Sequence, residues 1–253
     1  MTAIKIPKGK KIYFSSDNHL GAPTAEASMP REKKFVQWLD SIKHDAEAIF
    51  LLGDLFDFWF EYKYVVPKGF TRVLGKLAEL SDQGIKIHFF VGNHDMWMNG
   101  YFEEELGITV HYQPKEFTFN STSFFIGHGD GLGPNDIGFK RLKKVFTNPF
   151  FNWLYRWLHP DIGVRFAQYL SIKNKVISGD EDVKFLGNDN EWLVQYCLKK
   201  LEEKHCDYFV FGHRHLPLDI ALNAQTHYVN LGDWITFYTY AVFEDGTLTL
   251  KEL

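Results

Sequence analysis

Short apolar runs that each end at a small or polar residue divide this chain into a repeating pattern. The runs cover residues 11–16, 48–52, 87–91, 123–126, 208–211 and 228–231. Their lengths suit buried strands, and segments 30–45 and 70–83 have the spacing of amphipathic helices. The second helix is expected to end at Gly84, because glycine adopts the left-handed conformation of a helix C-cap. The alternation predicts an α/β domain.

The rest of the chain is expected to complete one large domain. The C-terminal segment 238–250, with Asp245-Gly246 at its centre, predicts a β-hairpin. A chain of 253 residues buries a sizeable core without disulfide or metal staples. Cys197 and Cys206 form no CxxC pair, which suits a reduced protein, and both are expected to lie buried on a helix face.

The expected cellular location follows from two kinds of segment that are missing from the sequence. The N-terminal segment has no apolar region typical of a signal peptide. No apolar run reaches the about 18 residues that a spanning helix needs. We therefore expect a cytoplasmic protein, which leaves contact with a membrane surface open.

One segment, residues 131–191, interrupts the strand pattern. It separates two strand signals by more than an ordinary connection, which predicts a helical insertion within a domain spanning residues 1–253. Between residues 139 and 175 a single acid, Asp161, faces many cations and aromatic rings. The cations are Lys140, Arg141, Lys143, Lys144, Arg156, Arg165, Lys173 and Lys175. Such a mixture suits a surface for apolar chains and anionic groups, or the packing of a helical subdomain.

Side chains capable of metal binding follow five of the predicted strands. The motifs are Asp17-Asn18-His19, Gly53-Asp54, Gly92-Asn93-His94-Asp95, Gly127-His128-Gly129-Asp130 and Gly212-His213-Arg214-His215. One such motif alone would be read as a turn or a helix cap. Because open α/β sheets bind ligands beyond the carboxyl ends of their strands, five such ends indicate one composite site. Ordinary structural roles are assigned to His44, His88, His111, His159, His205 and His227.

The donor types restrict the metal. Oxygen and imidazole ligands without cysteine are typical of Mn²⁺, Fe²⁺, Co²⁺ or Zn²⁺. The candidate ligands are Asp17, His19, Asp54, Asn93, His128, His213 and His215, too many for one ion. Two ions about 3.5–4 Å apart can clamp the attacking and leaving oxygens of a displacement at phosphorus. The residues therefore predict a dinuclear hydrolase of phosphorus–oxygen bonds.

The five motifs, in this order, resemble those of the calcineurin-like metallophosphoesterases. The resemblance implies a four-layer α/β sandwich of two mixed β-sheets flanked by helices, with the metal centre over the strand ends. It implies one ion on Asp17, His19, Asp54 and His215, and another on Asp54, Asn93, His128 and His213. Asp54 would bridge the two ions.

The same resemblance implies catalytic roles beside the metals. Asn93 and His94 occupy catalytic positions, and His94 would protonate the leaving group or contact the phosphate. Asp57 and Asp130 are candidates for orienting the ligating imidazoles.

A closer resemblance is to the UDP-2,3-diacylglucosamine hydrolase branch. It is carried by SSDNHLG, LLGDLFDFW, GHRHLP and NLGDW. It implies hydrolysis of UDP-2,3-diacylglucosamine to UMP and 2,3-diacylglucosamine 1-phosphate in lipid A synthesis, with Mn²⁺ as the preferred metal and the insertion as a helical lid. His94 replaces the Arg, and Phe139 the Tyr, of the best-known members.

The lid of this branch implies further contacts. The implied substrate-binding residues are Asp136, Phe139, Arg165, Ser171, Asn174 and Lys175. The lid would also bring the enzyme into peripheral contact with an anionic inner membrane.

Other functions stay open from the sequence alone. The same dinuclear site could act on another phosphodiester or a nucleotide. The chain could also be a scaffold without catalysis, although its complete metal motifs argue against this. A nuclease is disfavoured by the net charge of −4, because nucleic-acid-binding proteins usually carry excess positive charge.

Overall fold

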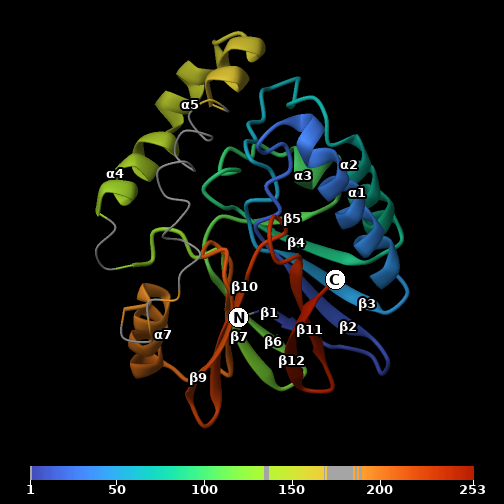
Figure 1. Ribbon diagram of the computed structural model, residues 1–253, viewed down its shortest axis with the longest axis vertical. Helices are drawn as coiled ribbons and strands as arrows, with labels where there is room; N and C mark the ends of the chain where they lie inside the picture. Colours follow the sequence, from blue (N-terminus) through green and yellow to red (C-terminus); the bar gives the residue numbers. More distant parts are fainter. Residues whose placement is uncertain (1, 134–136, 168, 170–184, 186, 188–189) are drawn as a thin grey trace.

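Two mixed six-stranded β-sheets form the centre of the protein (Figure 1). The structure is a computed structural model that describes residues 2–133, 137–167, 169, 185, 187 and 190–253, with residues 137–139 and 142 described by their backbone only. One sheet has the order β12-β11-β2-β3-β4-β5, and the other β1-β6-β7-β8-β10-β9. The predicted sandwich of two mixed sheets flanked by helices is confirmed.

The first sheet is parallel from β2 to β5 and antiparallel at β11 and β12. Its strands are β2 (Lys11–Ser15), β3 (Ala46–Leu51), β4 (Lys86–Phe90), β5 (Thr109–His111), β11 (Thr239–Glu244) and β12 (Thr247–Glu252). The predicted hairpin is confirmed as β11 and β12. Asp245 and Gly246, with φ of 49° and 83°, form its left-handed turn.

The second sheet places β7, β8 and β10 parallel at its centre. Its strands are β1 (Thr2–Ile4), β6 (Lys115–Phe119), β7 (Thr122–Ile126), β8 (Tyr208–Phe211), β9 (Pro217–Asn223) and β10 (Thr226–Leu231). Phe14 of the first sheet packs on Phe124 of the second with ring centroids 6.2 Å apart. The inner faces of the two sheets share this aromatic core, which explains part of the high aromatic content.

Helices cover the outer faces of both sheets (Figure 1). The first sheet carries α1 (Ala25–Ile42), α2 (Thr71–Asp82) and the short α3 (Tyr101–Glu104), and the second carries α7 (Trp192–Glu203). Gly84, with φ of 87°, follows α2 as expected. The first helix begins before the predicted residue 30, because Thr24 caps it by accepting the Ala27 N–H at 3.1 Å. Pro30 therefore lies inside α1.

The described part of segment 131–191, the expected insertion, is mainly helical and stands beside the sandwich (Figure 1). It contains α4 (Ile137–Phe146), α5 (Pro149–Arg156) and helical residues 160–167. The Trp97 indole donates to the Phe146 carbonyl at 2.8 Å, and Arg156 donates to the Asn99 side chain at 2.6 Å. These contacts fix the ends of α4 and α5 against the loop that follows β4.

The two cysteines are buried but differ in location. Cys197 lies on α7, whereas Cys206 lies between α7 and β8. The expectation of a helix face is therefore wrong for Cys206, because α7 ends at Glu203. None of the helices in the described ranges is both long and apolar enough to cross a membrane.

Candidate metal centre

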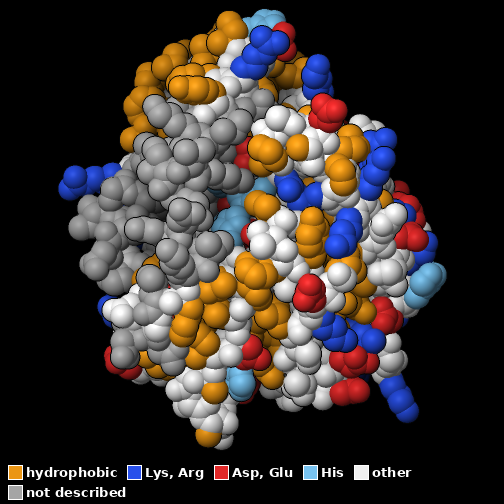
Figure 2. Space-filling model, in the orientation of Figure 1, with side chains coloured by type: hydrophobic (Ala, Val, Ile, Leu, Met, Phe, Trp, Pro, Cys, Tyr) orange, Lys and Arg blue, Asp and Glu red, His pale blue; other side chains and the backbone are white. Residues whose placement is uncertain are grey.

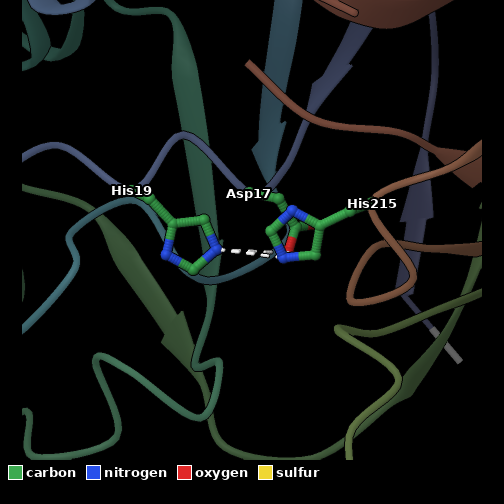
Figure 3. Close-up of side chains that lie close together, drawn as sticks. All are labelled: Asp17, His19 and His215. Atoms are coloured by element: carbon green, nitrogen blue, oxygen red, sulfur yellow. Dashed lines mark hydrogen bonds and ion pairs between the residues drawn. The ribbon is translucent and has the colours of Figure 1, made fainter. Parts of the chain in front are cut away.

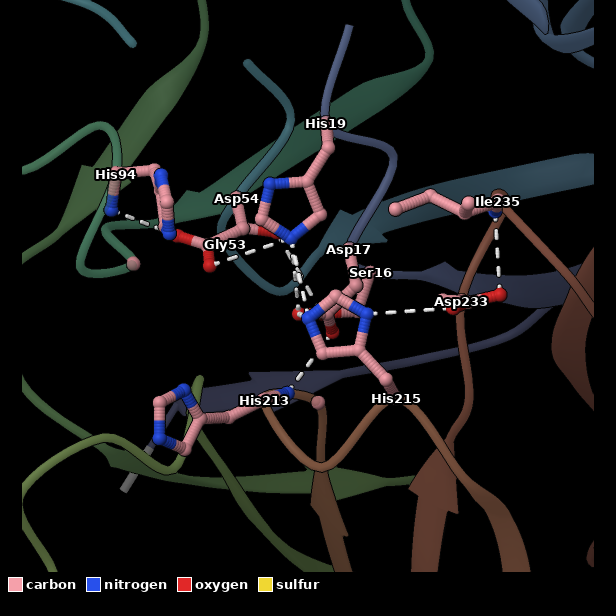
Figure 4. A network of polar contacts seen from close by, with 12 residues as sticks. Ser16, Asp17, His19, Gly53, Asp54, His94, His213, His215, Asp233 and Ile235 are labelled. Atoms are coloured by element: carbon pink, nitrogen blue, oxygen red, sulfur yellow. Dashed lines mark hydrogen bonds and ion pairs between the residues drawn. The ribbon is translucent and has the colours of Figure 1, made fainter. Parts of the chain in front are cut away.

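The candidate ligands meet where the carboxyl ends of both sheets converge (Figure 4). Asp17 and His19 follow β2, Asp54 follows β3, and Asn93 follows β4. From the second sheet, His128 follows β7, and His213 and His215 follow β8. The structure thus brings together all seven residues that the motifs single out.

The backbone at this junction is mostly left-handed. Five candidate ligands have positive φ: Asp17 (53°), His19 (43°), Asp54 (52°), His213 (69°) and His215 (49°). Such conformations cost free energy in residues other than glycine and concentrate at functional sites. Strand β2 ends at Ser15, so turns after the strand, and not its alternation, direct Asp17 and His19 toward the site.

The motif glycines permit a close approach of the loops. A Cβ atom on Gly92 would overlap Oδ1 of Asp54, and one on Gly212 would overlap Oγ of Ser16. Any side chain at either position would push the loops apart. These glycines therefore set the spacing of the candidate ligands.

One group of ligand atoms comes from Asp17, His19 and His215 (Figure 3). Nε2 of His19 lies 3.2 Å from Nε2 of His215, and Oδ1 of Asp17 lies 3.4 Å from the latter atom. Among the described residues, no group donates a hydrogen bond to the buried Oδ1 of Asp17. A buried carboxylate oxygen facing two imidazole nitrogens fits a divalent cation.

The second group comes from Asp54, His128 and His213. Oδ2 of Asp54 lies 3.4 Å from Nε2 of His128, and Oδ1 of Asn93 lies 3.2 Å from the same nitrogen. Oδ2 of Asp54 also lies 3.6 Å from Nε2 of His19, which belongs to the first group. Asp54 is thus placed between the two groups, as a bridging carboxylate must be.

Hydrogen bonds orient two of the rings for ligation. The contact between Nδ1 of His128 and the Leu52 carbonyl is 2.6 Å, and that between Nδ1 of His215 and Oδ2 of Asp233 is 3.2 Å. With Nδ1–H as the donor in each contact, Nε2 is the ring atom that faces the site, where a bound cation would take the place of its proton. Asp233 in turn accepts hydrogen bonds from the N–H group of Ile235 (Figure 4) and from those of Thr236 and Phe237.

Sequence reasoning missed two carboxylates here. Asp233 lies in the NLGDW segment and Asp95 in the GNHD motif, but neither received a role from these signals. Asp95 accepts hydrogen bonds from the N–H groups of Gly92 and Leu55, both at 2.8 Å. It therefore joins the loop after β4 to the loop after β3.

His94 lies at the edge of the site. Its N–H donates to Oδ1 of Asp54 at 2.9 Å, and its Nδ1 is 2.8 Å from the Asp57 carbonyl. Its ring meets the His19 ring edge-on, with centroids 4.8 Å apart. With Nδ1–H donating to Asp57, Nε2 is the atom that can exchange a proton with a substrate.

The two carboxylates predicted to orient imidazoles lie in different surroundings. Oδ1 of Asp57 is 3.8 Å from Nδ1 of His19 and 4.0 Å from Nδ1 of His94. Oδ2 of Asp130 is 2.5 Å from Nζ of Lys143 on α4. Asp130 thus links the GHGD motif to the insertion.

Buried charges of opposite sign balance one another in this site. Burial would raise the pKa of Asp54, but the neighbouring His128 and His94 rings hold it well below its usual range. Burial raises the pKa of Asp17 despite the opposing effect of His215. Burial and the nearby His128 lower the pKa of His213 to about 3, so its ring is neutral and has a lone pair for a cation.

The predicted substrate contacts are only partly covered by the structure. Asp136, Ser171, Asn174 and Lys175 lie outside the described residues, as does the side chain of Phe139 on α4. Arg165 is exposed in the helical stretch 160–167 and is not part of the ligand clusters.

Comparison of the sequence with known proteins identifies a family. The family model described as Calcineurin-like phosphoesterase matches residues 10–217. The UDP-2,3-diacylglucosamine hydrolase of Porphyromonas gingivalis is 41% identical over 258 residues, covering 96% of this chain and 97% of that protein. The protein of the same name from Vibrio parahaemolyticus is 27% identical over 234 residues, covering 88% and 90%.

Among solved structures, the E. coli phosphoesterase Yfce is 15% identical with a TM-score of 0.46, covering 94% of this chain and 91% of that one. The family model spans well over half of the chain, including every candidate ligand. This chain belongs to the calcineurin-like phosphoesterase family.

Proposed function

We propose that this protein hydrolyses the pyrophosphate of UDP-2,3-diacylglucosamine, releasing UMP and 2,3-diacylglucosamine 1-phosphate in lipid A biosynthesis. The observation that carries the proposal is the Asp54-centred pair of ligand groups in a chain 41% identical, over 96% of its length, to a hydrolase of that name. The two groups supply the chemistry at phosphorus, and the likeness over nearly the whole chain supplies the substrate.

The chain's own residues have separate tasks in this reaction. Asp17, His19, Asp54 and His215 would hold one divalent ion, and Asp54, Asn93, His128 and His213 the other. When bound, such a pair supplies Lewis-acid activation of water and of the phosphoryl oxygens. The Asp54 carboxylate fixes the separation of the two groups. Asp233 and Leu52 hold the rings of His215 and His128 in the ligating orientation.

His94 would act on the substrate directly. The Asp57 carbonyl holds Nδ1, so a protonated ring presents Nε2–H toward the site. That proton would pass to the oxygen of the departing group, or Nε2–H would bind a phosphoryl oxygen. Asn93, the residue before His94, would assist this proton transfer or phosphate contact, with its Oδ1 placed 3.2 Å from Nε2 of His128.

We assign Mn²⁺ as the native metal. Imidazole, carboxylate and amide ligands suit Mn²⁺, although Fe²⁺, Co²⁺ and Zn²⁺ accept the same donors. Metal-stripped protein is supplied with each ion in turn, and the rates of UMP release rank the four ions as activators.

The insertion is proposed to act as a lid that receives the acyl chains. Every residue of α5 is at least partly exposed. Phe150 and Trp153 on this helix are 62% and 53% exposed, and Trp157, which follows it, is 74% exposed. Figure 2 shows hydrophobic side chains gathered at this end of the molecule. Soluble proteins rarely leave so many large apolar side chains uncovered unless they meet lipid or a partner.

The same surface is proposed to bring the protein to the cytoplasmic face of an anionic membrane. Lys140, Arg141 and Lys144 lie on α4, and Arg156 lies on α5, the helix that carries Phe150 and Trp153. Rings that enter the acyl region beside cations that bind head groups are typical of peripheral contact. Asp136, Phe139, Arg165, Ser171, Asn174 and Lys175 stay proposed substrate contacts of this lid.

The test compares two substrates in the presence of Mn²⁺. UDP-2,3-diacylglucosamine is assayed for UMP release, and bis-p-nitrophenyl phosphate, which has no acyl chain, is assayed for nitrophenol. Efficient UMP release, lost in Asp54→Ala, is the expected result. Cleavage of the soluble diester alone would overturn the lipid substrate and favour another phosphodiester at the same site.

A Trp153→Ser/Trp157→Ser variant tests the lid. It should raise KM for the acylated substrate and weaken sedimentation with anionic vesicles, while turnover of the soluble diester stays unchanged. Unaltered KM and vesicle binding would contradict the assignment of this surface to lipid.

A further inference from the structure

Arg214 stands between two candidate ligands, His213 and His215, and its charged group is buried. Its Nε donates to Oε2 of Glu191 at 3.0 Å, and its terminal nitrogen donates to Oε1 at 2.9 Å. The side chains of Arg214 and Glu191 are 4% and 0% exposed. Two parallel hydrogen bonds between planar groups fix their relative orientation as well as their distance.

Glu191 lies where the insertion returns to the sandwich. It precedes the first residue of α7, Trp192, and its carbonyl accepts the Gln195 N–H at 3.0 Å. The Arg214 fork therefore connects the loop that carries His213 and His215 to the first turn of α7.

The first turn of α7 also packs against the other ligand loop of the second sheet. The Trp192 ring meets the His213 ring at 5.8 Å and 73°. A Cβ atom on Gly129, which follows His128, would lie 3.3 Å from Cδ1 of Leu193. The start of α7 thus supports the loops of both His128 and His213.

Packing against the start of α7 holds the His213 ring, whereas hydrogen bonds hold the rings of His128 and His215. The rings of His128 and His215 have hydrogen-bond contacts through Nδ1 to Leu52 and Asp233. The His213 ring is packed between Trp192 and His128, with a centroid distance of 5.1 Å to the latter. Its backbone is held at a φ of 69°, with its N–H donating to Oδ2 of Asp17 at 2.9 Å.

We infer that Glu191 and Arg214 are a positioning pair that holds His213 in the metal subsite shared with Asp54, Asn93 and His128. Neither residue touches the substrate, and both act through the His213 loop and the first turn of α7. The inference rests on the two-metal site proposed above. Metal binding at this subsite would therefore depend on the start of α7, where segment 131–191 rejoins the sandwich.

The role of the pair in positioning His213 can be tested apart from its effect on the free energy of unfolding, because buried ion pairs contribute little net stability. Replacing both partners with apolar residues of similar size is often neutral or stabilising, whereas removing one partner leaves a buried charge. The double variant Arg214→Met/Glu191→Leu should therefore stay folded, with circular dichroism and Tm close to wild type. Arg214→Lys is the conservative variant, which keeps the charge but loses the planar fork.

The experiment titrates Mn²⁺ into metal-stripped full-length protein by calorimetry. Wild type should show two binding steps. The double variant should keep one step and weaken the other by about 10- to 100-fold, the usual effect of losing a partner that orients a ligand. Arg214→Lys should fall between the two. At low Mn²⁺, kcat of the double variant should drop, and higher Mn²⁺ should restore it without changing KM for substrate.

Leu80→Ala on α2 is the matched control, because it lowers Tm from a buried position in the other sheet's helical layer. Both of its Mn²⁺ steps should remain as in wild type. Two unchanged steps in the double variant, or equal weakening in Leu80→Ala, would overturn the positioning role. Absence of two steps in wild type would instead overturn the two-metal site itself.

Discussion

The main-chain N–H of His94 donates a hydrogen bond to Oδ1 of Asp54 at 2.9 Å, while Oδ2 of the same carboxylate faces the imidazoles of both ligand groups. The loop that carries the proposed proton donor is thus held by the proposed bridging ligand. Any change at Asp54 therefore affects the metal pair and the placement of His94 together.

Replacing Asp54 with alanine should abolish both metal binding and hydrolysis. Oδ2 of this carboxylate faces imidazoles of both groups, so its removal takes away a ligand and a negative charge that the two groups share. Metal content measured by plasma mass spectrometry, together with UMP release, checks this. Wild-type turnover with an unchanged metal content would rule out the bridging assignment.

His94→Gln should lower kcat by about 10²- to 10⁴-fold while both ions stay bound. Glutamine can still accept or donate a hydrogen bond near Asp57 but cannot carry the transferred proton. Metal analysis of the variant is the control, because Asp54 also accepts the N–H at position 94. A kcat within error of wild type would remove His94 from the reaction.

Metal removal should lower thermal stability without unfolding the chain. With each ion at about 100 times its Kd, binding adds about 2.7 kcal/mol per ion, so EDTA should lower Tm by roughly 10–20 °C. The far-ultraviolet circular dichroism should persist, since two large cores lie outside the site. Asp54→Ala should show almost no Tm response to EDTA. Complete unfolding of the stripped wild type would contradict this.

A buried histidine pair away from the site should make stability fall in mild acid. Nδ1 of His88 lies 3.1 Å from Nε2 of His111, and burial lowers the pKa of both to about 4. Each takes up a proton on unfolding once the pH is below the unfolded value of about 6.5. The contribution of the two histidines to the free energy of unfolding is therefore fully present above about pH 6.5. It falls toward pH 4, by up to about 1.4 kcal/mol per pH unit for each residue.

Urea unfolding of metal-stripped protein at pH 7, 6 and 5 tests this pair. His88→Gln should have a shallower pH slope than wild type, and the difference between the two slopes removes the contribution of the metal-site residues. His227→Gln, whose exposed ring pairs with Asp219, is the matched control. Parallel slopes for wild type and His88→Gln would show that His88 is not held neutral.

The sequence predicted the central strands and the β11–β12 hairpin well, and the other edge strands poorly. Strands β2, β3, β4, β7, β8 and β10 are flanked on both sides by other strands, and their continuous apolar runs reflect burial on both faces. The edge strands β1, β5 and β9 are short or half-exposed, and β6 pairs with the edge strand β1. Their pairing depends on neighbours, which composition alone does not reveal.

The site shows the same division. His, Asp and Asn beside motif glycines could be found along the chain because each motif follows a strand. Asp95 and Asp233 were missed because a carboxylate in a turn gains its role only from the amides and rings that the folded chain brings to it. The Arg214–Glu191 contact likewise joins positions whose proximity no local pattern encodes.

Ligands drawn from residues 17 to 215 and from both sheets have a consequence for biogenesis. No N-terminal portion of the nascent chain contains either ligand group in full, because each group includes a residue of the GHRH motif. A growing chain can therefore form much of the first sheet's parallel half early, and with it the cluster of His19, Asp54 and His94, but it completes neither ligand group until β8 has been synthesised and joined. Assembly of the two-group centre therefore waits for the synthesis of β8 and its pairing within the second sheet.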